Sequence, residues 1–161
     1  MIVVSNTTPL IGLAVLQRFD LLRQLFGEIY IAQAVYTEAV VAGREAGGAK
    51  HEVSSADWIH TVEVKDRLAV EVLLDELDLG EAETIVLAHE LGADWILMDE
   101  KKGRRKLSQL GMSKMGTVGI LLKAKQVGLL STIQPDLEKL HQQGFSISQD
   151  VINAVLRQAG E

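Results

Sequence analysis

Short apolar runs rich in β-branched residues alternate with helical segments along this chain, and this alternation restricts the folds open to it. Strands are predicted at residues 2–5, 28–31, 58–62 and 95–98. The stretches between them have helical spacing, and we find no internal repeat. Strands that alternate with helices are typical of an α/β fold with a mainly parallel central sheet. We therefore predict that residues 1–161 form a single domain of this class.

Proline, glycine and capping residues set the expected boundaries of the helices. Thr8 is expected to cap a helix that starts at Pro9, and Gly92 is expected to end another. Residues 43–48 contain three glycines and are predicted to form a mobile loop. Helices are expected at residues 9–16, 19–26, 33–41, 67–77, 81–91, 101–110, 117–126, 136–143 and 149–159, with an edge strand at 113–115.

The composition excludes several kinds of functional site and indicates a cellular compartment. The chain has no cysteine, which excludes disulfides, thiolate metal sites and cysteine nucleophiles. The four histidines lack the paired spacing of a zinc site. Without a basic leader or a long apolar run, we expect a cytoplasmic protein with no signal peptide and no membrane span. The net charge of −6 argues against indiscriminate nucleic-acid binding but leaves room for a local basic patch.

Oxygen-bearing side chains stand where several of the predicted elements begin or end. Asn6 follows the first strand, Glu81 and Glu83 open a helix, and Asp99 and Glu100 follow the apolar strand before them. In open parallel sheets, ligands bind outside the carboxyl ends of the strands. Converging oxygen atoms are the ligands that Mg²⁺ and Mn²⁺ prefer. The sequence therefore suggests a metal-dependent phosphodiesterase.

Structural roles compete with each of these assignments. Asn6 and Asp99 are also suited to capping helices, and acids in a first helical turn complement the helix dipole. Glu81 and Glu83 point about 200° apart on a helix, so we expect only one of them to face the crevice. Glu38, considered alone, is expected to be a solvated charge on a helix face.

A basic cluster follows the acidic pair. Five of the sixteen basic residues lie within six positions, at Lys101, Lys102, Arg104, Arg105 and Lys106. Such a cluster is usually a solvated helix face. Beside an acidic metal pocket it would instead attract and orient phosphates.

At these residues the chain resembles the PIN-domain ribonucleases, and more narrowly a PIN-like prokaryotic subfamily of unknown function. The similarity covers nearly the whole chain and rests on residues 3–11, 36–38, 79–83, 97–100 and 116–117. It implies a three-layer, Rossmann-like fold with an acidic pocket that binds Mg²⁺ or Mn²⁺ and cleaves RNA. Many small prokaryotic members of this family are toxins of toxin–antitoxin pairs, restrained by a small partner protein.

The resemblance also implies roles for individual residues. Asn6 stands where the family's first aspartate is expected, and Glu38 matches the acid of the third helix. Glu81 matches the next acid, with Glu83 as a nearby substitute, and Asp99 matches the acid after the later strand. The residues expected in catalysis are Asp99, Glu81 and Glu38. Those expected to bind the metal are Asn6, Glu81, Glu83, Asp99 and Glu100. Those expected to contact RNA are Lys101, Lys102, Arg104, Arg105, Thr8 and Thr117.

Asn6 is the main departure from the family pattern. An asparagine keeps an oxygen ligand but removes one negative charge, which weakens cation binding. The leading hypothesis is a metal-dependent endoribonuclease, with RNA as substrate and a small antitoxin protein or a second copy of the chain as partner. The second is a catalytically silent module that binds RNA or a protein. A phosphoacceptor domain of the response-regulator type ranks last, because two consecutive acids near the first strand are absent.

Overall fold

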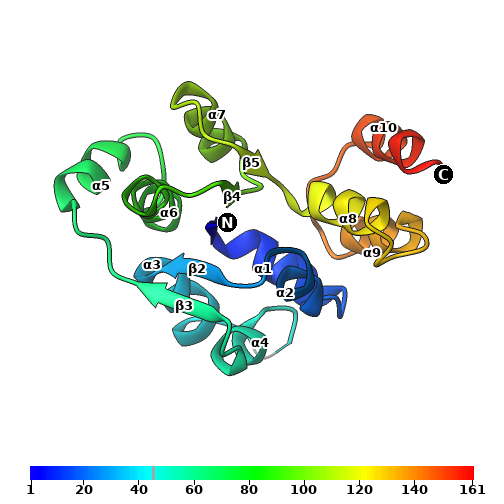
Figure 1. Ribbon diagram of the computed structural model, residues 1–161, viewed down its shortest axis with the longest axis horizontal. Coiled ribbons are helices and arrows are strands. Elements are labelled where there is room, and N and C mark those ends of the chain that lie inside the picture. The colour runs from blue at the N-terminus through cyan, green and yellow to red at the C-terminus, as the bar shows by residue number, and fades with distance from the viewer. Residues whose placement is uncertain (45) are drawn as a thin grey trace.

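A sheet of five parallel strands forms the centre of the computed structural model, which describes residues 1–44 and 46–161. Its spatial order is β3-β2-β1-β4-β5 (Figure 1). The prediction of an α/β fold is confirmed. The strands are β1 (Val3–Ser5), β2 (Ile29–Ala32), β3 (Ile59–Val62), β4 (Trp95–Leu97) and β5 (Lys114–Met115).

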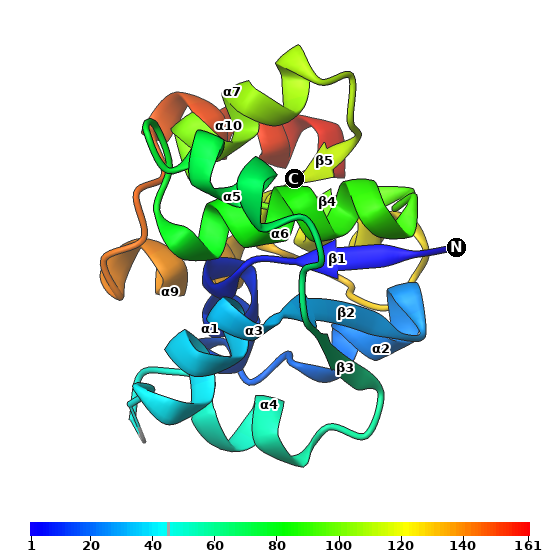
Figure 2. The same ribbon diagram turned by 90° about the vertical axis from the view of Figure 1, so that its left-hand side faces the viewer.

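Helices cover both faces of this sheet. Helix α6 packs against β1 and β2 on one face, where α5 and α7 contact it, and α1, α2 and α8 lie on the other side of the strands (Figures 1 and 2). The helices are α1 (Thr7–Val15), α2 (Asp20–Phe26), α3 (Gln33–Tyr36), the π-helical turn η1 (Thr37–Val41), α4 (Lys50–Ser55), α5 (Arg67–Leu73), α6 (Leu79–Leu91), α7 (Lys101–Gln109), α8 (Thr117–Gln126), α9 (Gln134–Gln142) and α10 (Gln149–Ala159).

The core is aliphatic and continuous. Val3 and Val4 of β1 and Ile96 and Leu97 of β4 are fully buried, as expected for central strands covered on both faces. Helix α6 is buried along its length from Gly80 to Ala88, because the sheet lies under it and other helices cover it.

Several boundaries differ from those expected. Helix α1 begins at Thr7 with Asn6 in extended conformation before it, so the expectation that Thr8 caps a helix from Pro9 is wrong. Helix α4 was not expected, because its six residues are mostly polar and bury only Val53. The predicted mobile loop at 43–48 includes residue 45, which lies outside the described residues.

The order of the strands reverses at β1, which places the crevice for ligands. β1 pairs with β2 on one side and with β4 on the other, so successive crossovers leave in opposite directions. Ligands in such sheets bind at the carboxyl ends of the strands beside this reversal. Ser5 lies opposite Leu97 there, which brings Asn6 close to the end of β4.

Within residues 1–44 and 46–161, no helix has both the length and the apolar character needed to cross a bilayer.

Candidate metal-binding site

Asn6 is buried at the carboxyl end of β1 and joins β1 to β4. Its backbone N–H donates to Leu97 O at 2.9 Å. Its side-chain amide donates to Glu100 Oε2 at 3.1 Å and to Met98 Sδ at 3.3 Å. Since a carboxylate can only accept, the amide nitrogen must be the atom that faces Glu100. The orientation of the Asn6 side chain is therefore fixed by Glu100.

The other end of the Asn6 amide is unsatisfied. Asn6 Oδ1 is buried and has no hydrogen-bond partner among the described residues. No side-chain cap from Asn6 to helix α1 is formed within this part of the chain. A buried amide oxygen without a partner is costly, because its desolvation is not repaid. Asn6 Oδ1 is thus a buried oxygen that could ligate a cation, and the side chain does not cap α1.

Glu100 connects Asn6 to the first turn of α1. One oxygen of its half-buried carboxylate accepts from the Asn6 amide, and the other accepts from the Thr8 hydroxyl. Thr8 was expected to contact RNA, and here its hydroxyl holds Glu100. Asp99 and Glu100, which follow β4 after Met98, have different partners.

Asp99 is fixed against the start of α8. Its Oδ1 accepts from the Thr117 backbone N–H at 2.8 Å and its Oδ2 accepts from the Thr117 hydroxyl at 2.7 Å. A side chain at position 116 would collide with this carboxylate, because a Cβ on Gly116 would lie 2.8 Å from Oδ1. Burial raises the pKa of Asp99 above its ordinary value, and Glu100 adds to the rise, while Thr117 and Arg104 oppose it. The carboxylate is therefore held in one orientation by Thr117 but remains costly to ionise.

Glu38 reaches the same edge from a π-helical turn. The i→i+5 hydrogen bond from Ala42 N to Thr37 O, at 2.8 Å, marks this wider turn, a feature often found at functional sites. Glu38 Oε2 accepts from the Thr7 hydroxyl at 2.7 Å, and the carboxylate lies so close to Gly80 that a side chain there would collide with it. Burial raises the pKa of Glu38, and nearby carboxylates raise it further, against the Thr7 hydrogen bond.

Glu81 takes part in a reciprocal cap with Asp78. The Glu81 N–H donates to Asp78 Oδ1 at 2.8 Å, and the Asp78 N–H donates to Glu81 Oε1 at 3.0 Å. Burial raises the pKa of Glu81, and the charges of Asp78 and Glu100 add to the rise. Asp78 was not expected at this site, although Asp-x-x-Glu before an apolar run is the signature of such a cap.

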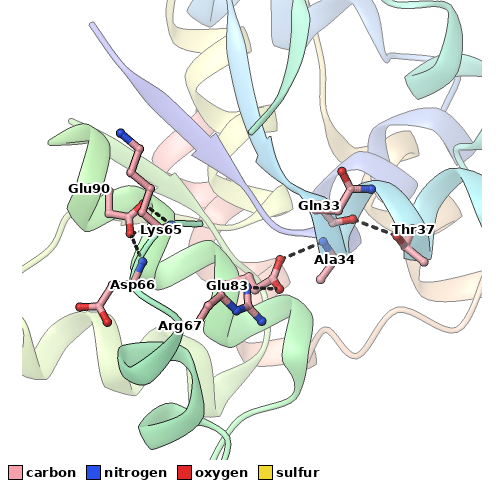
Figure 3. Close-up of polar contacts among 8 residues, drawn as sticks. All are labelled: Gln33, Ala34, Thr37, Lys65, Asp66, Arg67, Glu83 and Glu90. Carbon is pink, nitrogen blue, oxygen red and sulfur yellow. Dashed lines mark hydrogen bonds and ion pairs between the residues drawn. The ribbon is translucent and has the colours of Figure 1, made fainter. Parts of the chain in front are cut away.

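Glu83 has different partners from Glu81. Its Oε1 accepts from the Ala34 N–H at 3.0 Å, and its Oε2 pairs with Arg67 Nη1 at 2.9 Å (Figure 3). Both oxygens of this buried carboxylate are therefore used to tie α6 to the first turn of α3 and to α5. Nearby, Glu90 of the same helix accepts from the backbone of Lys65 and Asp66 (Figure 3).

The basic helix α7 divides its charges between two faces. Arg104 donates to Met98 O at 2.9 Å and lies close enough to Asp99 to oppose the rise in its pKa. Lys101, one turn earlier, lines a pocket that also contains Asp99 and Glu100. These two cations therefore belong to the acidic edge of the sheet.

The remaining cations of α7 face another neighbour. Lys102, Arg105 and Lys106 line a separate polar pocket of about 370 Å³ with Asp75 and Glu76. Lys106 pairs with Glu76 at 2.9 Å. The sequence pattern treated all five basic residues as one cluster that could attract phosphates. In the structure, two of them lie at the acidic edge and three lie beside Asp75 and Glu76.

The donor atoms at this edge suit a hard cation, but they are not gathered as a ready cluster. Amide and carboxylate oxygens are the ligands of Mg²⁺ and Mn²⁺. No three Asp, Glu or His side chains in the described part of the chain converge on one position. Mg²⁺ keeps several waters and needs only one or two protein carboxylates. The residues present therefore fit a largely hydrated ion held by one or two carboxylates, with the buried Asn6 Oδ1 as a further oxygen that could ligate it.

Comparison with known proteins agrees with the fold and with the resemblance noted in the sequence. A family model described as a PIN domain matches residues 2–161. No curated protein matches the sequence.

Proposed function

The chain belongs to the PIN-domain family, and we propose that it is an endoribonuclease that uses Mg²⁺ or Mn²⁺ to hydrolyse phosphodiester bonds in RNA. The observation that carries this proposal is the buried Oδ1 of Asn6 at the strand reversal, which has no partner among the described residues, while Nδ2 of the same amide donates to Glu100. Membership of the family supports a nuclease in general terms. RNA as the substrate and Mg²⁺ or Mn²⁺ as the ion are the finer parts of the proposal.

We assign the ion to Asn6, Asp99 and Glu100, with Glu38 and Glu81 acting through bound water. When bound, a divalent ion would polarise the phosphate and lower the pKa of a water molecule. Burial, with repulsion from neighbouring carboxylates added to it, raises the pKa values of Glu38, Glu81 and Asp99. A bound cation would lower these pKa values, which supports the assignment.

The protein's own side chains have three tasks in this proposal. A carboxylate with a raised pKa, such as Glu38 or Glu81, is a better proton acceptor for an attacking water than an ordinary one. Lys101 and Arg104 supply positive charge at the acidic edge, where the RNA phosphate would otherwise be repelled. Thr117 keeps the Asp99 carboxylate in one orientation.

A second function is favoured by the proton donors around the acids. Asn6 and Thr8 donate to Glu100, Thr7 donates to Glu38, and so the charges are partly compensated without a cation. An aspartate in place of Asn6 could not donate in this way. This observation favours a catalytically silent module that binds RNA or a protein partner.

The test is cleavage of a mixed-sequence RNA by the purified protein in EDTA, in Mg²⁺ and in Mn²⁺. We expect cleavage only with a divalent ion, and a loss of at least about tenfold in Asp99→Asn, since losing a ligand or its support costs about 10–100-fold. Asp57→Asn, at an exposed position, is the matched control. Divalent-independent activity, or equal activity of the two variants, would contradict the assignment of Asp99.

A further inference from the structure

We propose that the pocket between the acidic edge and the turn that joins α9 to α10 holds one unstacked base of single-stranded RNA. This inference rests on the proposed function for RNA as the ligand, but not on metal binding or on cleavage. The pocket has a volume of about 480 Å³, within the range of about 300–1,000 Å³ typical of small-ligand sites. Its lining includes Val118 of α8 and Val151 of α10, two helices that lie side by side (Figure 1).

The two walls of this pocket differ in character. One wall contains the carboxylates of Asp99 and Glu100 with Lys101 beside them. The lining from the turn before α10 and from α10 itself carries the apolar side chains of Phe145, Ile147 and Val151, together with Ser146 and Ser148. A ligand that fits must therefore be flat and apolar on one part, and on another part it must offer hydrogen-bond donors to the carboxylates and a negative group to Lys101. A nucleotide has this combination of a base and a phosphate.

Phe145 is held in place by the protein itself. Its N–H donates to Leu140 O at 3.1 Å, and its carbonyl accepts from the Ile147 N–H at 3.0 Å. The ring lies close to Gly12 of α1, where an added Cβ would lie 3.4 Å from Phe145 Cε1. The ring is half-buried. Its position is thus set before any ligand arrives, which reduces the entropy cost of stacking.

The chemistry of the two walls selects for a single strand. A base stacks on an aromatic ring only when it is free of its neighbours, as in single strands and loops. Lys101 at the polar wall would attract the phosphate. The nearby carboxylates, which only accept hydrogen bonds when ionised, suit the 2′-hydroxyl or an amino group of the base. A duplex keeps its bases stacked and could not insert one here.

The test measures binding of a single-stranded hexaribonucleotide that contains 2-aminopurine, in EDTA, by fluorescence quenching. We expect Phe145→Leu to weaken binding by about 5-fold or more, the lower end of what removal of a stacking ring costs. Phe145→Tyr, which keeps an aromatic face, should bind within about twofold of the wild type. The same sequence as a duplex should be insensitive to both changes.

A second pair of variants does not depend on how Phe145 supports the fold. Val151 is 45% exposed in the pocket wall, and Val127 is 58% exposed and is not part of that wall. Val151→Trp should fill the pocket and weaken binding of the single strand by at least tenfold, whereas Val127→Trp should leave it unchanged. Circular dichroism verifies the fold of each variant.

The outcomes separate this inference from the proposed nuclease. Wild-type affinity in both folded Phe145→Leu and Val151→Trp would overturn the pocket, as would equal weakening of duplex binding or the absence of single-strand binding by the wild type at 1 mM protein. Binding that follows the expected pattern without cleavage in Mg²⁺ or Mn²⁺ would keep the pocket and overturn the nuclease. Cleavage in Mg²⁺ or Mn²⁺ that is insensitive to Phe145→Leu and Val151→Trp would keep the nuclease and overturn the pocket.

Discussion

At the scale of single residues, the site is a set of carboxylates that are each bonded to a hydroxyl or an amide. Asp99 depends on Thr117, Glu38 on Thr7, and Glu100 on Asn6. These donors orient the carboxylates but do not remove the cost of gathering and burying them, because the pKa values of Glu38 and Asp99 are still raised. An ionised Asp99 therefore lowers the stability of the metal-free protein.

This cost predicts how Asp99→Asn changes stability with pH. The pKa of Asp99 is raised in the folded protein, so the folded state binds its proton more tightly than the unfolded state does. Stability consequently falls as the pH rises from the ordinary aspartate pKa through the folded pKa, in contrast to the usual ion-paired carboxylate. An asparagine does not titrate and keeps acceptor capacity for the Thr117 N–H.

The stability advantage of Asp99→Asn over the wild type should therefore grow from pH 3 to pH 7 in EDTA. Urea unfolding monitored by circular dichroism measures this difference at each pH, and Asp57→Asn controls for the loss of an exposed charge. A difference that is constant over this range, or that shrinks as the pH rises, would contradict the account of Asp99.

The sequence predicted part of this residue-scale picture for clear reasons. Asn6 and Asp99 were found because each follows an apolar strand, and strand ends in a parallel sheet are places for ligands. The partners of Thr8 and Glu83 could not be predicted, because they are distant in the sequence. Thr8 contacts Glu100, which is 92 positions away, and Glu83 contacts Ala34, which is 49 positions away. Such contacts depend on how the elements pack, which a local pattern does not contain.

At the scale of elements, helix α6 holds the site together through its buried acids. Glu83 binds the first turn of α3, and α3 continues into the π-helical turn that carries Glu38. The carboxylate also complements the positive end of α3. Glu83 therefore positions the element that carries Glu38, in addition to its ion pair with Arg67.

We predict that Glu83→Gln lowers the free energy of unfolding by about 1–2 kcal/mol, because a hydrogen bond to a charged group is lost while Arg67 stays partly solvated. Its Mg²⁺ affinity should remain that of the wild type. Urea unfolding and calorimetric titration measure the two quantities, with Glu71→Gln on the exposed side of α5 as control. Unchanged stability together with weakened Mg²⁺ binding would instead make Glu83 a metal ligand.

The two faces of α7 predict unequal effects on RNA binding. Lys101 lines the pocket at the acidic edge, whereas Arg105 faces Asp75 and Glu76. Lys101→Ala should make the slope of log affinity against log salt concentration shallower by about 0.7, the value for one phosphate contact with a single strand. Arg105→Ala should change this slope less.

Fluorescence anisotropy with a labelled single-stranded RNA over a range of KCl concentrations gives both slopes. An equal decrease for Arg105→Ala would extend the RNA path to the far face of α7. An unchanged slope for Lys101→Ala would make this lysine a solvated residue without a phosphate contact.

At the scale of the whole molecule, the alternation of strands and helices was enough to predict the class of fold. The strand runs are short but β-branched and buried, so the pattern was strong at β1 and β4. Helix α4 was missed because its sequence, Lys-His-Glu-Val-Ser-Ser, has little apolar periodicity and is ordered by its contact with η1. The π-helical turn was read as ordinary helix, because a wider turn leaves no signal in side-chain spacing.

We further propose that the endoribonuclease is the toxin of a toxin–antitoxin pair, and this role predicts an effect on whole cells. Expression of the chain alone should slow growth, Asp99→Asn should not, and co-expression of a small neighbouring gene product should relieve the effect. Growth curves with immunoblots for soluble protein measure this. Harmless expression of soluble wild-type protein would favour the silent module.

The central claim is that the buried oxygen of Asn6 is a metal ligand, and Asn6→Asp tests it most directly. In EDTA, the aspartate cannot donate to Glu100 and places a second carboxylate about 3 Å from it, so thermal stability should fall. Mg²⁺ or Mn²⁺ should restore that stability. Calorimetric titration should show an affinity at least tenfold higher than that of the wild type, equivalent to about 1.4 kcal/mol. Equal affinity of the wild type and folded Asn6→Asp for both ions would contradict the claim.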